Sequence, residues 1–381
     1  MSKTSTKDRL ISLDVLRGFV MFWIMSGEHI IHALAKAAPI PVLIWMSSQL
    51  HHADWNGITF YDMIFPVFLF VAGVSMPYSF EKKMSLAGVK TPRELPSKEK
   101  QKIYTSMLRR TCILLFLGFV VNGLLRFDGF EQTRFASVLG RIGLAWFFAG
   151  LIYLNFDLKK QLFWFLGILI GYYLAMKFIP VPEFGAGVLT REGSLEAYID
   201  RLFLPGRLHS KVYDPEGLFS TIPAVATALL GVFLGTFLKT KNSLPANKQL
   251  VILIVSGLVL IGTGLLWNYD FPVNKHLWTS SFVCLVGGFS ILFFTFFYFI
   301  TDILGFRKWA FPLILIGSNS ILIYIASEGL VNFKSTADFV FGGAIKFFPL
   351  IWQPVFTALS VTLVQLLLLY FLYKRKWFLK V

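Results

Sequence analysis

Long apolar runs separated by short polar segments recur along the whole chain. Each run approaches the roughly 20 residues that an α-helix needs to cross the hydrocarbon of a bilayer. The pattern predicts an all-α polytopic membrane protein with about ten transmembrane helices, spanning residues 10–35, 59–80, 104–125, 136–156, 161–179, 217–238, 249–268, 277–300, 308–330 and 349–373. Residues 335–347 form a short extra or re-entrant helix in this interpretation. No polar segment is long enough for a separate soluble domain, so residues 1–381 are expected to form a single domain.

Composition supports the membrane assignment. Hydrophobic residues make up 56% of the chain, with 41 phenylalanines, which excludes an ordinary soluble domain. The two cysteines, Cys112 and Cys284, both fall within apolar spans. We expect them to pack there as small hydrophobic residues and to form no disulfide.

Charge orients the helices. The polar segments 1–9, 81–110, 157–160, 239–248, 302–308 and 374–381 carry more than twice as many Lys and Arg as the alternating set 36–58, 126–135, 180–216, 269–276 and 331–348. Because loops rich in Lys and Arg stay in the cytoplasm, the first set and both termini are expected inside. This asymmetry explains the net charge of +15 without a nucleic-acid partner. The first apolar stretch is kept as a span, since Asp14 and Arg17 precede the short apolar core that a cleaved signal peptide would need.

Under this topology all six histidines lie at the outer face. Two of them open the stretch His51–Pro66, which also holds Asp54, Trp55, Asn56 and Asp62 and then continues into an apolar span. Polar groups at the mouth of a membrane helix are costly and mark functional sites by default. We therefore expect this stretch to hold the active site of the protein.

A histidine can take a proton from an attacking amine or hydroxyl near neutral pH, which makes His52 a candidate general base. Glu28 or Asp54 is expected to orient its ring and to stabilise the imidazolium. Asn56 either caps the following helix or donates to a developing oxyanion, and Trp55 is either an interfacial residue or a stacking platform for a sugar ring. These histidines and carboxylates match no zinc motif, so no metal is expected.

A charged pair lies in the first span. Asp14 and Arg17 are three residues apart and share one helical face. An isolated arginine inside a membrane is costly, so Arg17 is expected to face the protein interior or a water-filled cavity. The pair is either a structural ion pair or a cation presented to an anionic ligand from the cytoplasm.

Several motifs resemble the heparan-α-glucosaminide N-acetyltransferase family and its bacterial relatives. The stretch from His52-Ala-Asp-Trp-Asn-Gly57 onward carries this resemblance, together with Arg9–Gly18 near the start of the chain. Further agreement lies in Arg134–Gly143, Tyr213–Gly217, Pro272–Trp278 and Gly317–Ser320. The resemblance implies a transmembrane acyltransferase fold and an enzyme that moves an acetyl group from cytoplasmic acetyl-CoA to an amino sugar on the far side.

The resemblance also assigns residues. His52 falls on the active-site histidine of the family, whereas Glu28 stands, by ungapped count, where the lysosomal member has a functional asparagine. A carboxylate does not donate a hydrogen bond as an amide does, so Glu28 is a departure in the expected catalytic set of His52, Glu28 and Asn56. Residues expected to bind acetyl-CoA are Arg17, Arg141 and Asn319. Those expected to bind the acceptor are Asp54, Trp55, Asp214, Glu216, Asn274, Lys275 and Trp278.

Two other classes of function compete with the enzyme. Ten spans with polar residues inside them also fit a transporter of amino sugars, which would show a broken helix at the bilayer midplane. A binding or scaffold protein without catalysis would bind no acetyl-CoA. Within the enzyme hypothesis, direct transfer and a ping-pong route through acetyl-His52 both remain open. We expect a multi-pass protein of a bacterial inner membrane, in contact with lipid, and the sequence leaves a homodimer open.

Overall fold

The computed structural model describes residues 10–126, 129–240 and 244–379, so the expected cytoplasmic segment 1–9 lies outside the described part. The described chain is helical, and its only β-pairing consists of two isolated bridges, Arg134 with Gly206 and Val181 with Gly185. Within these residues nine helices are long and apolar enough to cross a membrane, or ten if one bent pair is counted as a span. The predictions of an all-α fold and of about ten spans are confirmed.

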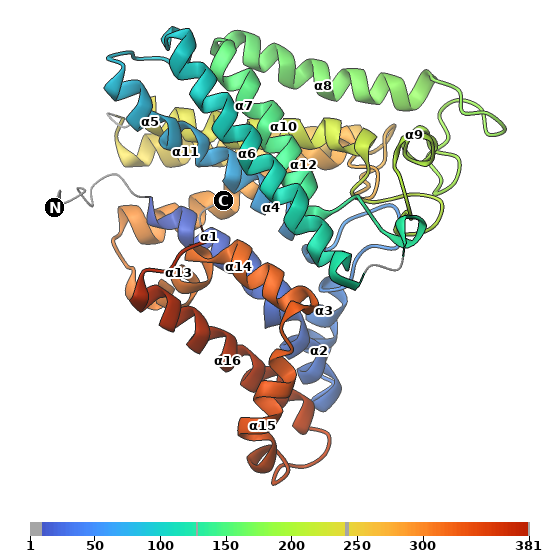
Figure 1. The fold of residues 1–381 in the computed structure, drawn as a ribbon, viewed down its shortest axis with the longest axis vertical. Coiled ribbons are helices and arrows are strands. Elements are labelled where there is room, and N and C mark those ends of the chain that lie inside the picture. The colour runs from blue at the N-terminus through green and yellow to red at the C-terminus, as the bar shows by residue number, and fades with distance from the viewer. Residues whose placement is uncertain (1–9, 127–128, 241–243, 380–381) are drawn as a thin grey trace. The chain divides into compact units, whose positions relative to one another are not determined.

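The chain divides into two compact units, each described here by itself. The first, which we call the terminal unit, comprises the residues up to His52, Thr59–Ile64 and the residues from Leu292 onward. Its complete helices are α1 (Ile11–Phe22), η1 (Trp23–Gly27), α2 (Glu28–Ala37), α3 (Pro41–Gln49), η5 (Phe299–Ile303), η6 (Lys308–Ala310), α13 (Phe311–Ser318), α14 (Ser320–Ile325), η7 (Ala326–Leu330), α15 (Phe333–Ile345) and α16 (Gln353–Arg375). Figure 1 shows α13 and α14 beside α1, and α16 beside α13.

The second, the central unit, comprises Ala53–Ile58 and Phe65–Ile291. Its complete helices are α5 (Met76–Leu86), η2 (Pro92–Glu94), α6 (Ser97–Val121), η3 (Leu124–Arg126), η4 (Phe130–Gln132), α7 (Val138–Asn155), α8 (Leu158–Phe178), α9 (Leu195–Phe203), α10 (Leu218–Thr240) and α11 (Ala246–Trp267). Helices α4 (Phe60–Val74) and α12 (Ser280–Tyr298) contribute to both units. The expectation of a single domain stays a prediction.

Close backbone contact joins α1 to α13 in the terminal unit. A Cβ atom added to Gly18 would lie 1.8 Å from the carbonyl oxygen of Leu313, and one added to Gly317 would lie 2.0 Å from that of Asp14. Small residues permit this approach, and van der Waals packing of this kind holds helices together where lipid supplies no hydrophobic drive. The two glycines therefore fix the crossing point of the first span with α13.

The predicted span 308–330 is not one straight helix. It bends by 66° between α13 and α14 at Asn319, whose φ of −131° and ψ of 34° leave the helical region. The Asn319 amide donates to the carbonyl of Trp377 at 2.9 Å, and its oxygen accepts from the N–H of Leu379 at 3.0 Å. A side chain that bonds a distant backbone segment stabilises this break, which periodicity does not show.

The helix α15 corresponds to the predicted short segment 335–347. It has 13 residues, fewer than the roughly 20 that crossing requires, and it is not among the candidate spans of the described chain. It packs against α16. Its placement as a re-entrant helix stays a prediction.

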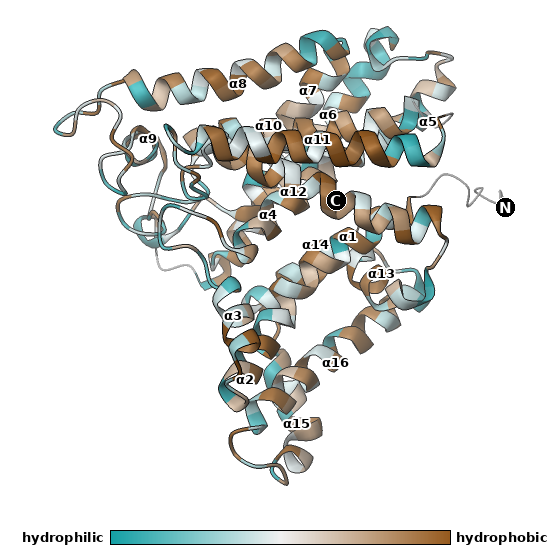
Figure 2. Cartoon of the chain, turned by 180° about the vertical axis from the view of Figure 1, so that it is seen from behind, coloured by the Kyte–Doolittle hydropathy of each residue, from teal (hydrophilic) through white to brown (hydrophobic). Residues whose placement is uncertain are grey.

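Burial separates the helices of the central unit. In the most apolar stretch of α10, 78% of the residues are buried, and α10 packs against α5, α7, α8 and α9. In α11 only 17% are buried, although this helix has the highest hydropathy of the set and is largely brown in Figure 2. A helix that is apolar and uncovered by protein faces lipid in a membrane protein.

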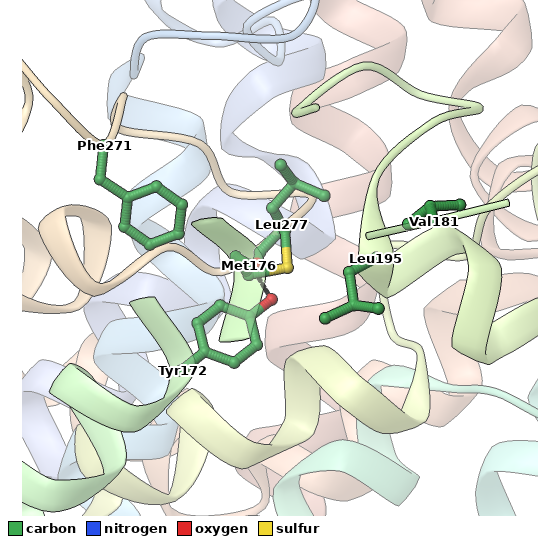
Figure 3. Packing of buried hydrophobic residues seen from close by; sticks show 6 residues of the cluster. All are labelled: Tyr172, Met176, Val181, Leu195, Phe271 and Leu277. Atoms are coloured by element: carbon green, nitrogen blue, oxygen red, sulfur yellow. Dashed lines mark hydrogen bonds between the residues drawn. The ribbon is translucent and has the colours of Figure 1, made fainter. Parts of the chain in front are cut away.

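A small apolar core ties the loops of the central unit to α8. Tyr172 and Met176 of α8 meet side chains from the loop after α8, from α9 and from the segment after α11, namely Val181, Leu195, Phe271 and Leu277 (Figure 3). The Tyr172 hydroxyl donates to the carbonyl of Leu277 at 2.6 Å. The long predicted loop 180–216 therefore packs against α8 through this core.

The glycine contact between α1 and α13 gives a first prediction. Gly317→Ala places a methyl group against the backbone of Asp14, and overpacking of this kind destabilises by about 1–3 kcal/mol. We expect a lower midpoint of thermal unfolding for the detergent-purified variant, measured by intrinsic fluorescence. Gly171→Ala in α8 is the control, since beyond the neighbouring backbone of its own helix no described atom lies within 4 Å of its new methyl group. Equal midpoints for both variants would contradict the close crossing.

Candidate active site

The first turn of α4 holds a buried carboxylate that contacts His52. The Nδ1 atom of His52 lies 2.7 Å from Oδ1 of Asp62, whose side chain is 1% exposed, whereas that of His52 is 49% exposed. The other oxygen, Oδ2, accepts from the N–H of Thr59 at 3.1 Å and lies 3.0 Å from its hydroxyl. With Thr59 before the helix and Asp62 at its third position, this is half of a capping box.

This arrangement sets the tautomer of His52. An ionised carboxylate accepts the Nδ1 proton, which leaves Nε2 as the basic nitrogen. The carboxylate on the ring is Asp62, whereas the sequence suggested Glu28 or Asp54. Asn56 was a candidate to cap the start of α4. There the side chain of Asp62 accepts from the N–H of Thr59 instead.

Glu28 reaches His52 through an intermediate side chain. Its carboxylate is hydrogen-bonded to the Tyr61 hydroxyl, and the Tyr61 ring packs on the His52 ring with 4.9 Å between centroids. The same carboxylate lies 3.2 Å from Nδ1 of His29. The structure thus brings together two members of the predicted catalytic set, with Tyr61 between them.

Two more histidines of the terminal unit form a neighbouring pair. His32 and His51 stack with 4.4 Å between ring centroids, and Nδ1 of His32 lies 2.7 Å from the hydroxyl of Ser47 in α3. This contact joins α2 to α3. Across the described residues, no three His, Cys, Asp or Glu side chains gather as a group that could hold a metal ion.

The remaining part of the His-x-x-Trp-Asn-Gly motif belongs to the central unit. Asn274 donates from Nδ2 to Oδ1 of Asn56 at 3.1 Å, and the N–H of Gly57 donates to the carbonyl of Val273 at 2.8 Å. Asn274 is 1% exposed and also accepts from the N–H of Leu277 at 2.9 Å. Two of the predicted site residues, Asn56 and Asn274, are therefore in direct contact. Lys275, another predicted site residue, comes directly after Asn274 and is half-buried.

The Trp55 ring packs against two side chains of the central unit. His276 stacks on it at 5.2 Å, and the guanidinium of Arg191 lies 5.4 Å from its centre. Arg191 also bonds the carboxylate of Asp54 at 2.7 Å, although the Asp54 side chain is 96% exposed. Trp55 is half-buried, and its contact with a sugar ring stays a prediction.

Asp214 and Glu216 are held by one cation. Arg134 bonds both carboxylates, with 2.8 Å between its Nε and Oδ2 of Asp214. Burial favours a raised pKa for Asp214, but the bonds to Arg134 and to the backbone outweigh it and lower the pKa. Burial likewise opposes the charge of Arg134, but the two carboxylates raise its pKa above the ordinary value. Through Arg134, Asp214 and Glu216 hold the loop before α10 in place. Their contact with an acceptor stays a prediction.

Trp278 and Arg141 lie in the core of the central unit. Trp278 is 1% exposed, donates to the Thr227 hydroxyl at 3.1 Å and has the Arg141 guanidinium 4.9 Å from its ring. Arg141 donates to the carbonyl of Gly217 at 3.2 Å and to the Ser220 hydroxyl. Their described contacts are structural, and direct contacts with substrate or acetyl-CoA stay predictions.

Two carboxyl groups beside Arg141 share a buried site that the sequence interpretation missed. Glu196 and Asp200, one turn apart on α9, are both fully buried. Neither Oε2 of Glu196 nor Oδ2 of Asp200 meets a hydrogen-bond donor among the described residues. One proton shared between them satisfies both oxygens. Burial, and then the charge of Asp200, raise the pKa of Glu196 well above its ordinary value, and burial raises the pKa of Asp200 to about 6.

The other two residues predicted to bind acetyl-CoA lie in the terminal unit. Arg17 is 3.5 Å from Asp14, with side-chain exposures of 27% and 9%, so the pair expected from their spacing is present. Asn319 is 2% exposed, and its amide bonds the segment that follows α16. A role in binding acetyl-CoA stays a prediction for both.

Comparison with known proteins agrees with the family that the sequence motifs resemble. The chain is 26% identical over 385 residues to the human heparan-alpha-glucosaminide N-acetyltransferase, an alignment that covers 87% of this chain and 55% of the human protein. The mouse protein of the same name is 26% identical over 392 residues, with 87% of this chain and 56% of the mouse protein covered. The chain is a distant homologue of this acetyltransferase. It spans about half the length of these curated relatives, and no family model matches it.

The pair Glu196 and Asp200 gives a prediction for pH. A carboxyl whose pKa is raised by folding stabilises the protein below its unfolded pKa of about 4, and this contribution is lost as the pH rises through the folded value. We expect the thermal midpoint of the purified protein to fall by several degrees between about pH 5 and about pH 8. Asp214, whose pKa is lowered, changes stability only below this window.

Variants separate the pair from other groups. Glu196→Gln keeps the shape and a donor toward Asp200, so its thermal midpoint should be much less dependent on pH. Glu192→Gln, which changes an exposed glutamate in the turn before α9, should follow the wild type. A pH dependence that Glu196→Gln leaves unchanged would rule out the shared proton as its cause.

Proposed function

We propose that the protein is a membrane acetyltransferase that moves an acetyl group from cytoplasmic acetyl-CoA to an amino sugar or glycan on the opposite side. The observation that carries the proposal is the bond between His52 and the buried Asp62, within the stretch that resembles the acetyltransferase family. The distant homology supports the reaction class. The proposed location is a bacterial inner membrane, and the expected N-in, C-in topology puts His52 on its outer side.

The proposed chemistry follows from the tautomer of His52. The acceptor amine or hydroxyl attacks the thioester carbonyl, and Nε2 of His52 takes the proton that the nucleophile loses. The carboxylate of Asp62 stabilises the imidazolium and keeps its orientation. Collapse of the tetrahedral intermediate breaks the carbon–sulfur bond, and the CoA thiolate receives a proton as it leaves. In the ping-pong alternative Nε2 first carries the acetyl group itself.

The other predicted residues have supporting roles in this proposal. Asn56 is proposed to donate to the oxyanion, and Glu28 to act on His52 through Tyr61. Arg17, with Arg141 and Asn319, is proposed to serve the acetyl-CoA side, where a cation suits the anionic donor. The acceptor side is proposed to involve Asp54, Trp55, Asp214, Glu216, Asn274, Lys275 and Trp278.

A transporter is the second candidate, and one observation favours it. The span 308–330 is broken at Asn319, and discontinuous helices form the substrate sites of many transporters. Uptake of an amino sugar into liposomes, without release of CoA from acetyl-CoA, would support that function over the acetyltransferase.

The enzyme hypothesis predicts the behaviour of the His52 pair. In purified full-length protein with acetyl-CoA and glucosamine, His52→Ala should abolish release of CoA, followed by mass spectrometry. Asp62→Asn should lower kcat by about 10²–10⁴-fold, because the amide no longer stabilises the imidazolium or fixes the tautomer. The isosteric asparagine still accepts from Thr59, so the helix start should remain folded.

The neighbouring histidine supplies the control. His51→Ala should retain kcat within about twofold, since the resemblance singles out His52. Release of CoA that persists in His52→Ala would remove His52 from the mechanism. Labelled acetyl trapped on the protein without acceptor would select the ping-pong route, and kinetics that require both substrates bound together would select direct transfer.

A further inference from the structure

A π-helical turn and a kinked turn of the terminal unit meet at a single buried side chain. The π-helical turn is η1, and the kinked turn is η7, where the backbone of Glu328 and Gly329 leaves the helical region. Both turns contact Gln365 of α16. A π-helical turn departs from the regular backbone ladder and often marks a functional site. Inside a membrane, backbone groups that such a turn leaves without a hydrogen bond need partners from the protein.

Gln365 bonds one serine hydroxyl of each turn. Its Oε1 accepts from the Ser26 hydroxyl of η1 at 2.5 Å, and its Nε2 donates to the Ser327 hydroxyl of η7 at 3.2 Å. The same nitrogen makes a longer contact of 3.5 Å with the carbonyl of Met25 inside η1. Gln365 and Ser26 are each 2% exposed, so water does not compete for these bonds.

Gly27 completes the tight packing of η1. A Cβ atom there would lie 2.7 Å from the ring of Trp23 and 2.9 Å from that of Phe22. The turn is therefore held from within by two aromatic rings and from outside by Gln365. The residue that follows directly is Glu28, so the geometry of η1 sets the direction of the Glu28 side chain.

We infer that Gln365 is a positioning residue for the acetyl transfer, because it fixes η1, and thereby Glu28, relative to Tyr61 and His52. The inference rests on the proposed function. Gln365 lies in α16, far from Glu28 along the chain, and neither the motifs nor the charge pattern of the sequence single it out. Groups that hold catalytic side chains in place change rates strongly, and misplacement by about 1 Å lowers them by about 10²-fold.

Three variants of α16 test this role. Gln365→Leu removes every bond at similar volume. Gln365→Glu keeps the shape, and its new carboxyl both accepts and donates when neutral but only accepts when ionised. Thr362→Val is the matched control one turn earlier, where the buried hydroxyl bonds the carbonyl of Ala358 in its own helix at 2.8 Å.

The expected results differ between these variants. Gln365→Leu should lower kcat at least about tenfold while KM for acetyl-CoA stays within about twofold, because a positioning defect acts on the reacting geometry. Gln365→Glu should approach wild-type kcat at low pH and lose it as the pH rises, more steeply than the wild type. Thr362→Val should match the wild type in both. A wild-type kcat for Gln365→Leu, or a Gln365→Glu profile parallel to the wild type, would overturn the inference.

A second measurement does not depend on turnover. The His29 side chain is 68% exposed and lies 3.2 Å from the Glu28 carboxylate. Displacement of Glu28 in Gln365→Leu should speed carbethoxylation of His29 by diethyl pyrocarbonate, followed by mass spectrometry, relative to the wild type and Thr362→Val. Equal rates in all three proteins would overturn the inference. Absence of acetyl transfer by the wild type would refute the proposed function instead, and the labelling would still decide whether Gln365 holds Glu28 in place.

Discussion

An ionised carboxylate one turn inside a membrane helix is stable only if protein groups replace the water it has lost. Asp62 meets this requirement with the N–H and hydroxyl of Thr59 and with the imidazole of His52. The same bonds start α4 and orient the histidine. One carboxylate thus serves both the first helical turn and the candidate base, with one oxygen bonded to Thr59 and the other to His52.

The central unit stabilises its buried carboxyl groups by other means. Asp214 has the permanent charge of Arg134 as its partner, so it stays ionised. Glu196 and Asp200 lie near Arg141, but burial still raises the pKa of both, so a proton shared between them would remove one of two buried charges. The region from α9 to the start of α10 thus depends on an ionised carboxylate at Asp214 and on a protonated carboxyl at Glu196 and Asp200. Its stability should respond to pH in opposite directions at the two ends of the range.

Much of the fold could be predicted from the sequence, because hydropathy over about 20 residues is a local property. The pairing of Asp14 with Arg17 was also readable, since three residues define one helical face. The spacing of Thr59 and Asp62 is that of a capping box, so the partner of Asp62 was open to prediction as well. Contacts such as Asn56 with Asn274 and Ser26 with Gln365 join residues more than 200 positions apart, and no local pattern encodes them.

The break at Asn319 bears on the choice between enzyme and transporter. In a transport site, the ends of a broken helix point at the solute, and their unpaired backbone groups bind it. Here the amide at the break is already bonded to the backbone of Trp377 and Leu379. A solute at this position would have to displace the chain itself. The break therefore fixes a segment of the protein, and the polar groups arranged around a basic nitrogen are those of His52, Asp62 and Tyr61, which fits a fixed reaction site better than a path for a solute.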